Sequence, residues 1–407
     1  MNLARIAYAY ARQSPLATLL NLALLTLGVA TVIVLLLLTT ALDQRLKHDA
    51  AGIDLVVGAK GSPLQLVLAG VFHVDVPPGN IPLAEIDRLK ANPLVRDVIP
   101  LAMGDSYRGS HIVGTVPEFL GLYGAKLAHG RLWQAPMEAV LGADVARRSE
   151  LATGARFAGS HGLAEGGGVH DDNPYRVVGV LEPSGTVIDR LVLTGIDSVW
   201  KVHEHEAVEE HVGEANNRTL LQATSPEREV TMALVRYATP LAAVSVPRLI
   251  NTETMLQSAS PAYESARLLT VFGVGTDVIR AFAAFLIVAA GLGMFIALYQ
   301  AMEERRYDLA IMRTLGASRG RVCAVLLLES LILAAVGAVL GIALGHALTA
   351  AIGTWLPSAA PLASGARRLL AGEVSVFAVV LGGGILAALL PAWRAYRLDV
   401  AAILAKA

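Results

Sequence analysis

The sequence predicts a membrane protein with four transmembrane α-helices and a large extracytoplasmic α+β domain inserted between the first and second helices. The chain is 54% hydrophobic and only 16% charged, whereas soluble domains are about 25% charged. Four long apolar runs, at residues 16–42, 281–302, 322–348 and 374–393, each reach the roughly 20 residues that a helix needs to cross a bilayer. Residues 43–276, of mixed composition, separate the first two runs.

The positive charges predict the orientation of these spans. Arginines and lysines flank the chain termini and the loop between the second and third runs: Arg5, Arg12, Arg305, Arg306, Arg313, Arg319, Arg321, Arg394, Arg397 and Lys406. The positive-inside rule then places both termini and the 303–321 loop in the cytoplasm, and residues 43–276 outside the inner membrane. The first run is too long for the apolar core of a cleaved signal peptide, so we interpret it as an uncleaved anchor.

The chain therefore divides into nine segments. They are a cytoplasmic amphipathic lead-in helix (1–14), the first span (15–42), a periplasmic α+β domain with a stalk (43–276), the second span (277–302), a charged cytoplasmic segment (303–321), the third span (322–348), a short periplasmic loop (349–373), the fourth span (374–393) and a cytoplasmic tail (394–407). An ordinary polar lead-in is the alternative for residues 1–14.

Residues 43–276 alternate β-rich runs with helical stretches, which is typical of an α+β domain. We expect strands at 54–57, 95–101, 110–116, 138–141 and 175–181, and helices at 82–91, 117–123 and 143–149. Residues 248–280 are compatible with one long helix that continues into the second span as a stalk. The segment carries 20 Lys and Arg against 27 Asp and Glu. The chain shows no basic stripe of the kind that nucleic-acid binding requires.

The 303–321 segment is the most informative part of the chain. It is a short charged segment between two apolar runs. Its apolar residues are Leu309, Ile311, Met312 and Leu315, and Gly316-Ala317-Ser318 is expected to end the helix. Such an amphipathic piece suits docking onto something at the membrane surface. The candidate docking residues are Glu303, Glu304, Arg305, Arg306, Leu309, Met312, Arg313, Gly316 and Ala317. The alternative is that the arginines only follow the positive-inside rule.

Several motifs resemble the MacB/FtsX (LolC/E-like, mechanotransmission) family of ABC transporter permeases. Besides the 303–319 segment, they are Gly114-Thr115-Val116-Pro117-Glu118-Phe119, Gly130-Arg131-Leu132-Trp133, Ala139-Val140-Leu141-Gly142, Tyr175-Arg176-Val177-Val178-Gly179-Val180-Leu181, Leu326-Leu327-Leu328-Glu329-Ser330 and Pro391-Ala392-Trp393-Arg394-Ala395. Their order and spacing carry the resemblance. Val400 departs from the family, whose members usually have proline there.

The resemblance implies an α+β domain like the MacB periplasmic core and a coupling role for residues 303–319. Two permease chains, identical or paralogous, would pair with two ATPase subunits whose ATP-driven motion moves the periplasmic domains. The expected outcome is export or extraction of a periplasmic or membrane-embedded substrate. The alternatives are an FtsX-like signalling subunit without transport, or a component of a zinc-homeostasis system. A periplasmic adaptor, a lipoprotein or a metal-carrying protein would be the corresponding further partner.

The chain contains no phosphate-binding Gly-x-x-x-x-Gly-Lys-Ser/Thr loop, and residues 43–276 contain no Gly-x-Ser-x-Gly nucleophile motif. We therefore expect a non-catalytic subunit without a cofactor of its own, with ATP and Mg²⁺ bound by a separate ATPase chain. Cys323, the single thiol, reads as a small buried hydrophobic residue.

Two features of the third span suggest specific roles. Gly337, Gly341 and Gly345 repeat every four residues and so share one helix face, where another helix can approach closely. That helix belongs either to the same chain or to a second copy. Glu329 is an intramembrane carboxylate, for which a structural role and a proton relay are the two alternatives.

Nine of the ten histidines lie in residues 43–276, and His203, His205 and His211 lie close together among carboxylates. Imidazole and carboxylate are suitable zinc ligands, but the spacing lacks the His-Glu-x-x-His pattern of a metalloprotease. A solvated acidic turn is the alternative. The hypothesis of zinc binding fails if calorimetric titration of zinc detects no binding that depends on these three histidines.

Overall fold

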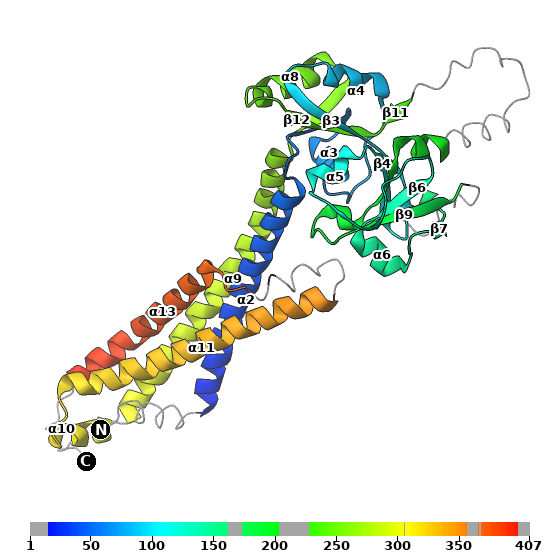
Figure 1. Ribbon diagram of the computed structural model, residues 1–407. Coiled ribbons are helices and arrows are strands. Elements are labelled where there is room, and N and C mark those ends of the chain that lie inside the picture. The colour runs from blue at the N-terminus through cyan, green and yellow to red at the C-terminus, as the bar shows by residue number, and fades with distance from the viewer. Residues whose placement is uncertain are drawn as a thin grey trace, which may run out of the picture. The chain divides into compact units, whose positions relative to one another are not determined.

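Four helices of the computed structural model are long and apolar enough to cross a membrane (Figure 1). They are α2 (Pro15–Asp49), α9 (Pro261–Glu304), α11 (Arg319–Trp355) and α13 (Ala371–Tyr396), and the short α10 (Arg306–Thr314) lies between α9 and α11. The structure describes residues 15–161, 173–202, 228–304, 306–355, 365 and 368–397. The predicted lead-in helix at 1–14 lies outside these residues.

The chain forms two compact units. The helical unit comprises Met1–Asp43 and Val271–Ala407, and the α+β domain comprises Gln44–Thr270. Helices α2 and α9 each contribute residues to both units, because α2 ends at Asp49 and α9 begins at Pro261. Each of the four long helices extends beyond the apolar run that predicted it.

Apolar side chains of all four long helices form the core of the helical unit. The buried set is Leu25, Val29, Ile33, Leu37, Ala290, Met294, Leu298, Ala334, Ala338, Val380 and Ala388. The alanines are small enough to let helix backbones approach, which is how helices pack where lipid removes the hydrophobic driving force. Many large apolar side chains on the outer faces, such as Phe282, Phe285 and Leu386, are exposed as expected for contact with lipid.

The α+β domain is organised around an eleven-stranded mixed sheet with a separate pair of short strands. Its strands are β1 (Leu55–Ala59), β3 (Val95–Tyr107), β4 (Ser110–Thr115), β5 (Leu127–Gly130), β6 (Glu138–Leu141), β7 (Arg156–Phe157), β8 (Ser160–His161), β9 (Tyr175–Leu181), β10 (Val192–Gly195), β12 (Met232–Tyr237) and β13 (Leu256–Ala259); β2 (Ile81–Pro82) pairs with β11 (Glu229–Val230). The main order is β13-β1-β12-β3-β4-β10-β6-β9-β5.

Most pairs in the sheet are antiparallel, whereas β10 runs parallel to β4 and β6 runs parallel to β9. Strands β6 and β10 are buried along almost their whole length, which explains the consecutive apolar residues Ala139-Val140-Leu141 and Val192-Leu193. The covering helices are α3 (Pro63–Gly70), α4 (Leu83–Lys90), α5 (Glu118–Leu122), α6 (Ala143–Ser149), α8 (Ala242–Glu253) and the 3₁₀ turn η1 (Val187–Arg190). Together with the four long helices, this architecture confirms the predicted fold class.

One expected helix is wrong in part. Residues 248–280 do not form a single helix, because α8 ends at Glu253 and Leu256–Ala259 form strand β13. Strand β13 pairs with β1, so that Gly58 lies opposite Gln257, and Leu256 and Ala259 are buried. Pairing with a strand about 200 residues earlier in the sequence outweighs the local helix propensity.

Candidate functional site

The short helix α10 is separated from α11 by a well-defined turn. Gly316 has φ +94°, and its N–H donates to the Arg313 carbonyl at 3.1 Å, while the Ala317 N–H donates to the Met312 carbonyl at 3.0 Å. These two hydrogen bonds form a Schellman motif with glycine in the left-handed position. Ser318 then begins α11, because its Oγ accepts from the Arg321 N–H at 3.3 Å. Together, these hydrogen bonds fix the length and the direction of the turn between α10 and α11.

The two faces of α10 differ in their surroundings. Met312 packs against a cluster of the helical unit that contains Met302, Val322 and Leu326. Leu315, in contrast, is 82% exposed, and Tyr307 and Ile311 are also exposed. The apolar groups presented outward are therefore Ile311 and Leu315, whereas Met312 is partly buried within the chain. The docking role of Met312 stays a prediction. Glu303 and Glu304 lie at the end of α9, and the side chains of Arg305, Arg306 and Leu309 lie outside the described residues.

Arginines near α10 stack on aromatic rings at the ends of the long helices. The Arg397 guanidinium lies 4.1 Å from the ring centroid of Trp393, and Arg394 lies 5.0 Å from that of Tyr299, to whose hydroxyl it also donates a hydrogen bond. Cation–π contacts and aromatic residues at this level are typical of a membrane–water interface. The Arg394–Tyr299 contact joins α13 to α9, whereas Arg397 and Trp393 both lie at the end of α13.

We expect Gly316→Ala to loosen the α10–α11 turn, because a Cβ at a positive φ costs about 1 kcal/mol or more. Gly320→Ala is the matched control: Gly320 lies inside α11, and an added Cβ there meets no atom within 4 Å. Thermal unfolding of the purified chain in detergent should show a lower midpoint for Gly316→Ala and an equal or higher one for Gly320→Ala. Equal midpoints would contradict a structural role for the turn.

The repeated glycines of α11 face α2 of the same chain. A Cβ on Gly337 would lie 2.6 Å from Leu25 Cδ2, one on Gly341 2.5 Å from Val29 Cβ, and one on Gly345 2.7 Å from Ile33 Cβ. Leu25, Val29 and Ile33 are also spaced by four residues, so two i, i+4 rows pack into each other. Of the two alternatives left by the sequence, these contacts favour packing within the chain.

Buried polar groups occur at two levels of the helical unit. Near α10, Glu329 is 6% exposed, and its neighbour Ser330 donates from Oγ to the Gly384 carbonyl at 2.5 Å. Further along α11, His346 Nε2 lies 3.1 Å from Glu373 Oε2, while Glu373 Oε1 accepts from the Leu370 N–H. The sequence did not predict this His346–Glu373 contact. The glutamate at the third position of α13 predicts only a cap on that helix.

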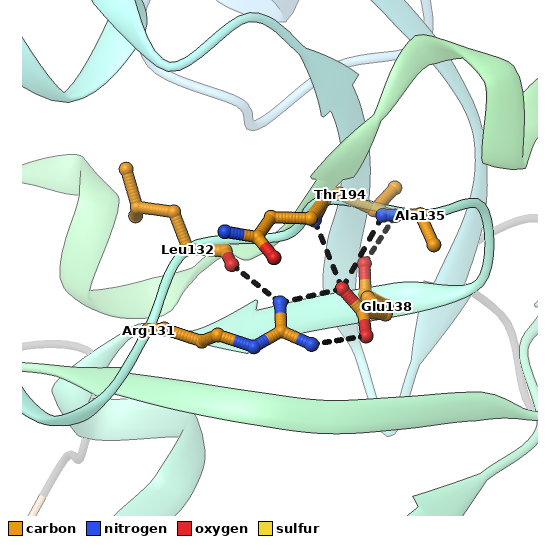
Figure 2. Close-up of polar contacts among 6 residues, drawn as sticks. Arg131, Leu132, Ala135, Glu138 and Thr194 are labelled. Carbon is orange, nitrogen blue, oxygen red and sulfur yellow. Dashed lines mark hydrogen bonds and ion pairs between the residues drawn. The ribbon is translucent and has the colours of Figure 1, made fainter.

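In the α+β domain, Arg131 and Glu138 form an ion pair with further hydrogen bonds around it (Figure 2). Arg131 donates to both carboxylate oxygens of Glu138, at 2.7 and 2.5 Å, and to the Leu132 carbonyl. Glu138 Oε2 also accepts from the backbone N–H groups of Gln134 and Ala135, and Thr194 Oγ1 donates to the Glu138 carbonyl. The pair thus ties the turn after β5 to β6 and β10.

This hydrogen bonding, chiefly from Arg131, lowers the pKa of Glu138 from 4.5 to about 2. A carboxylate with a lowered pKa stabilises the fold above its unfolded pKa, and the contribution is lost as the pH falls from about 4.5 towards 2. We expect Glu138→Gln to lower the unfolding midpoint at pH 7, and the difference from the parent to shrink progressively below pH 4.5. A difference that stays constant with pH would contradict this role for the carboxylate.

The predicted zinc ligands His203, His205 and His211 lie outside the described residues. Within the described part of the chain, no group of three or more His, Cys, Asp or Glu side chains could hold a metal ion. Zinc binding by the 203–211 run stays a hypothesis.

The fold defines a class of protein: a polytopic membrane protein with a large α+β domain between its first and second spans. The family description "MacB-like periplasmic core domain" matches residues 18–237, and "FtsX-like permease C-terminal" matches residues 280–400. The chain therefore belongs to the MacB/FtsX-like family of ABC transporter permeases, as the resemblance in its motifs predicted.

Two curated relatives are similar to parts of the chain. The uncharacterized ABC transporter permease YknZ of Bacillus subtilis (strain 168) is 28% identical over 152 residues, which is 37% of this chain and 36% of YknZ. The macrolide export ATP-binding/permease protein MacB of Shewanella oneidensis is 22% identical over 408 aligned positions, covering 88% of this chain and 56% of that protein. The chain thus spans between about a third and just over half of these relatives' lengths.

Solved structures similar to the chain include the periplasmic region of MacB from Actinobacillus actinomycetemcomitans, with 12% identity and a TM-score of 0.32 over 53% of this chain and 94% of that one. The extracellular domain of YknZ from Gram-positive bacteria has 14% identity and a TM-score of 0.29 over 51% of this chain and 99% of that one.

Proposed function

We propose that this chain is the membrane subunit of an ABC complex in which α10 receives the motion of an ATPase and the long helices pass it to the α+β domain. The observation that carries this proposal is α10 itself, an amphipathic helix with one face packed on the helical unit and the other exposed. Leu315 at 82% exposure and the exposed Ile311 offer an apolar ridge to a partner groove. Arg313 lies on the same short helix and offers positive charge to acidic groups of that partner.

The proposed transmission is mechanical. The Schellman turn at Gly316 holds α10 in a fixed geometry against the start of α11, so a push on α10 is not absorbed by a loose loop. Helices α2 and α9 run without a break from the helical unit into the α+β domain. A displacement of the helical unit therefore changes the position of the domain's first and last elements.

The proposal places ATP hydrolysis outside these 407 residues, because they contain no phosphate-binding loop. Contact between α10 and a cytoplasmic ATPase places α10 and both termini in the cytoplasm, and the α+β domain on the outer side of the inner membrane. Two copies of the ATPase and a second permease chain complete the assembly.

The size of the α+β domain favours export or extraction of a substrate over signalling without transport. The inserted domain is large, with 227 residues, Gln44–Thr270. The identity of a further partner would distinguish these alternative functions. An adaptor implies efflux, a cell-wall hydrolase implies signalling, and a metal-carrying protein implies zinc handling.

Affinity purification of the full-length chain from its own membranes, in mild detergent, tests the proposal directly. Mass spectrometry should find an ABC ATPase in near-stoichiometric amount, and membrane-permeant cross-linking should join it to residues of α10. Recovery of the chain without any ATPase, under conditions in which the chain remains monodisperse, would contradict the proposal.

A further inference from the structure

A small cavity of about 250 Å³ lies in the α+β domain, against one end of strands β3 and β4. Its lining residues are Val76, Pro77, Gly79, Asn80, Met103, Gly104 and His111. Most of this lining is apolar, and the groups with a lone pair suited to a metal ion are the Met103 thioether and the His111 imidazole. Both side chains come from adjacent, paired strands, so the sheet fixes their positions.

A second histidine, His73, lies beside His111. The rings of His73 and His111 have centroids 6.3 Å apart at an interplanar angle of 53°. His73 is 7% exposed, and both of its ring nitrogens are buried without a hydrogen-bond partner, as is Nε2 of His111. Burial of a polar atom without a partner costs about 1–3 kcal/mol, so three such atoms together call for a ligand.

The backbone at His73 gives independent support. His73 has φ +50°, in the left-handed region that a residue with a side chain rarely adopts. Strain of this kind costs of order 1–3 kcal/mol and is found preferentially at functional sites. The preceding residue, Phe72, belongs to the same buried cluster as Met103 and Val113, so the chain is held here by packing.

We propose that His73, His111 and Met103 form a binding site for a soft monovalent metal ion, Cu(I) or its analogue Ag(I). With metal–nitrogen bonds of about 2 Å, and ring nitrogens about 1 Å from the ring centre, two imidazoles on one ion have centroids roughly 5 to 6.5 Å apart. The observed separation of 6.3 Å lies at the wide end of this range. A centroid separation at the wide end of the range corresponds to a nearly linear nitrogen–metal–nitrogen angle, which d¹⁰ monovalent ions accept.

The ligand set distinguishes this ion from zinc. Structural zinc takes four ligands in a tetrahedron, and the described residues offer no third His, Cys, Asp or Glu at this place. Thioethers select Cu(I) rather than hard divalent ions. Arg190 is near enough to lower the pKa of His73, after the larger effects of burial and His111. A nearby guanidinium repels a divalent ion twice as strongly as a monovalent one.

The protonation state agrees with this assignment. Burial lowers the pKa of both histidines, that of His73 to about 3. Both imidazoles are therefore neutral at physiological pH, and an ion need not displace a proton from a ring lone pair. The site is independent of the proposed ATPase coupling, and its test measures metal binding alone.

The test is calorimetric titration of Ag(I) into the full-length chain in detergent and chloride-free buffer. Every protein titrated carries Cys323→Ser and alanine at positions 203, 205 and 211, which removes the competing thiol and the histidine-rich run. We expect one Ag(I) per chain. We expect His111→Phe and Met103→Leu each to weaken binding by about tenfold or more, since loss of even an outer-shell partner has an effect of that size.

Matched controls are His129→Phe and Met255→Leu, which replace an exposed histidine and an exposed methionine of the same domain. Both should bind as the parent does. If His111→Phe unfolds the domain, His73→Asn serves instead, because asparagine tolerates the left-handed backbone. X-ray absorption of the Cu(I)-loaded parent should show nitrogen and sulfur neighbours, with sulfur absent in Met103→Leu. Unchanged affinity in His111→Phe and His73→Asn, or a parent spectrum without sulfur, would overturn the site.

Discussion

We expect Gly341→Leu to abolish most of the folded, monodisperse protein. In the structure even a Cβ on Gly341 would lie 2.5 Å from Val29 Cβ and 3.0 Å from the Thr26 carbonyl oxygen of α2. These atoms are part of or next to the α2 backbone, so no side-chain rotation can relieve the contact. Overpacking a tight core costs about 1–3 kcal/mol for a few methylenes, and here two helices must separate. Size-exclusion chromatography and thermal unfolding in detergent measure the loss.

Gly383→Leu is the matched control for this substitution. Gly383 lies inside α13, is exposed, and has no atom within 4 Å of an added Cβ. The same change there should leave the yield and the unfolding midpoint close to those of the parent. If both variants were equally well folded, the close packing of α11 on α2 would be refuted.

The α+β domain should be equally sensitive at Gly130. This residue has φ +82°, and a Cβ would collide with the Val178 carbonyl oxygen and lie 2.7 Å from Gly179 Cα. Both are backbone atoms of β9, and the Val178 carbonyl already accepts from the Arg131 N–H at 3.0 Å. Gly130→Ala must therefore separate β5 from β9 and disturb the Arg131–Glu138 pair. We expect the domain to lose several kcal/mol of stability, on the order of the largest effects of single substitutions.

A second glycine separates the steric effect from the backbone effect. Gly185 has φ +74°, but an added Cβ meets no atom within 4 Å. Gly185→Ala should therefore cost only the left-handed backbone penalty of about 1–2 kcal/mol. Urea unfolding of the full chain, followed by tryptophan fluorescence, compares the two. Equal losses would mean that the β5–β9 contact tolerates a side chain.

Local pattern was enough to locate several elements of the domain. The strands at 138–141 and 175–181 and the helix at 143–149 have the predicted bounds. Each strand is a short, mainly apolar run that ends before a glycine or a charged residue, and Gly142 precedes the helix. Strand β3 was predicted to end at Leu101 but continues to Tyr107. Its second half, from Ala102 to Tyr107, pairs with β4 with a register shift between Met103 and Ser106, which no local pattern predicts.

Contacts between distant residues could not be read from the sequence. The glycine spacing in α11 predicted a close helix contact, but only the structure identifies α2 as the neighbour. Likewise, nothing in the sequence places His73 beside His111 or His346 beside Glu373. At α10 the amphipathic pattern predicted a docking helix that includes Met312, but it gave no sign that Met312 also packs within the chain. Its packing against Val322 and Leu326 depends on how α10 folds back onto α11.

Charge reversal on α10 tests the central proposal most directly. The full-length chain carrying Arg306→Glu and Arg313→Glu would be purified beside the parent, and the ATPase recovered with each would be quantified by mass spectrometry. A control carrying Arg367→Glu and Arg368→Glu has the same change in net charge in the segment between α11 and α13. We predict that the ATPase is lost from the α10 variant and retained by the parent and the control. Full recovery of the ATPase with the α10 variant would contradict the proposal that α10 is the coupling element.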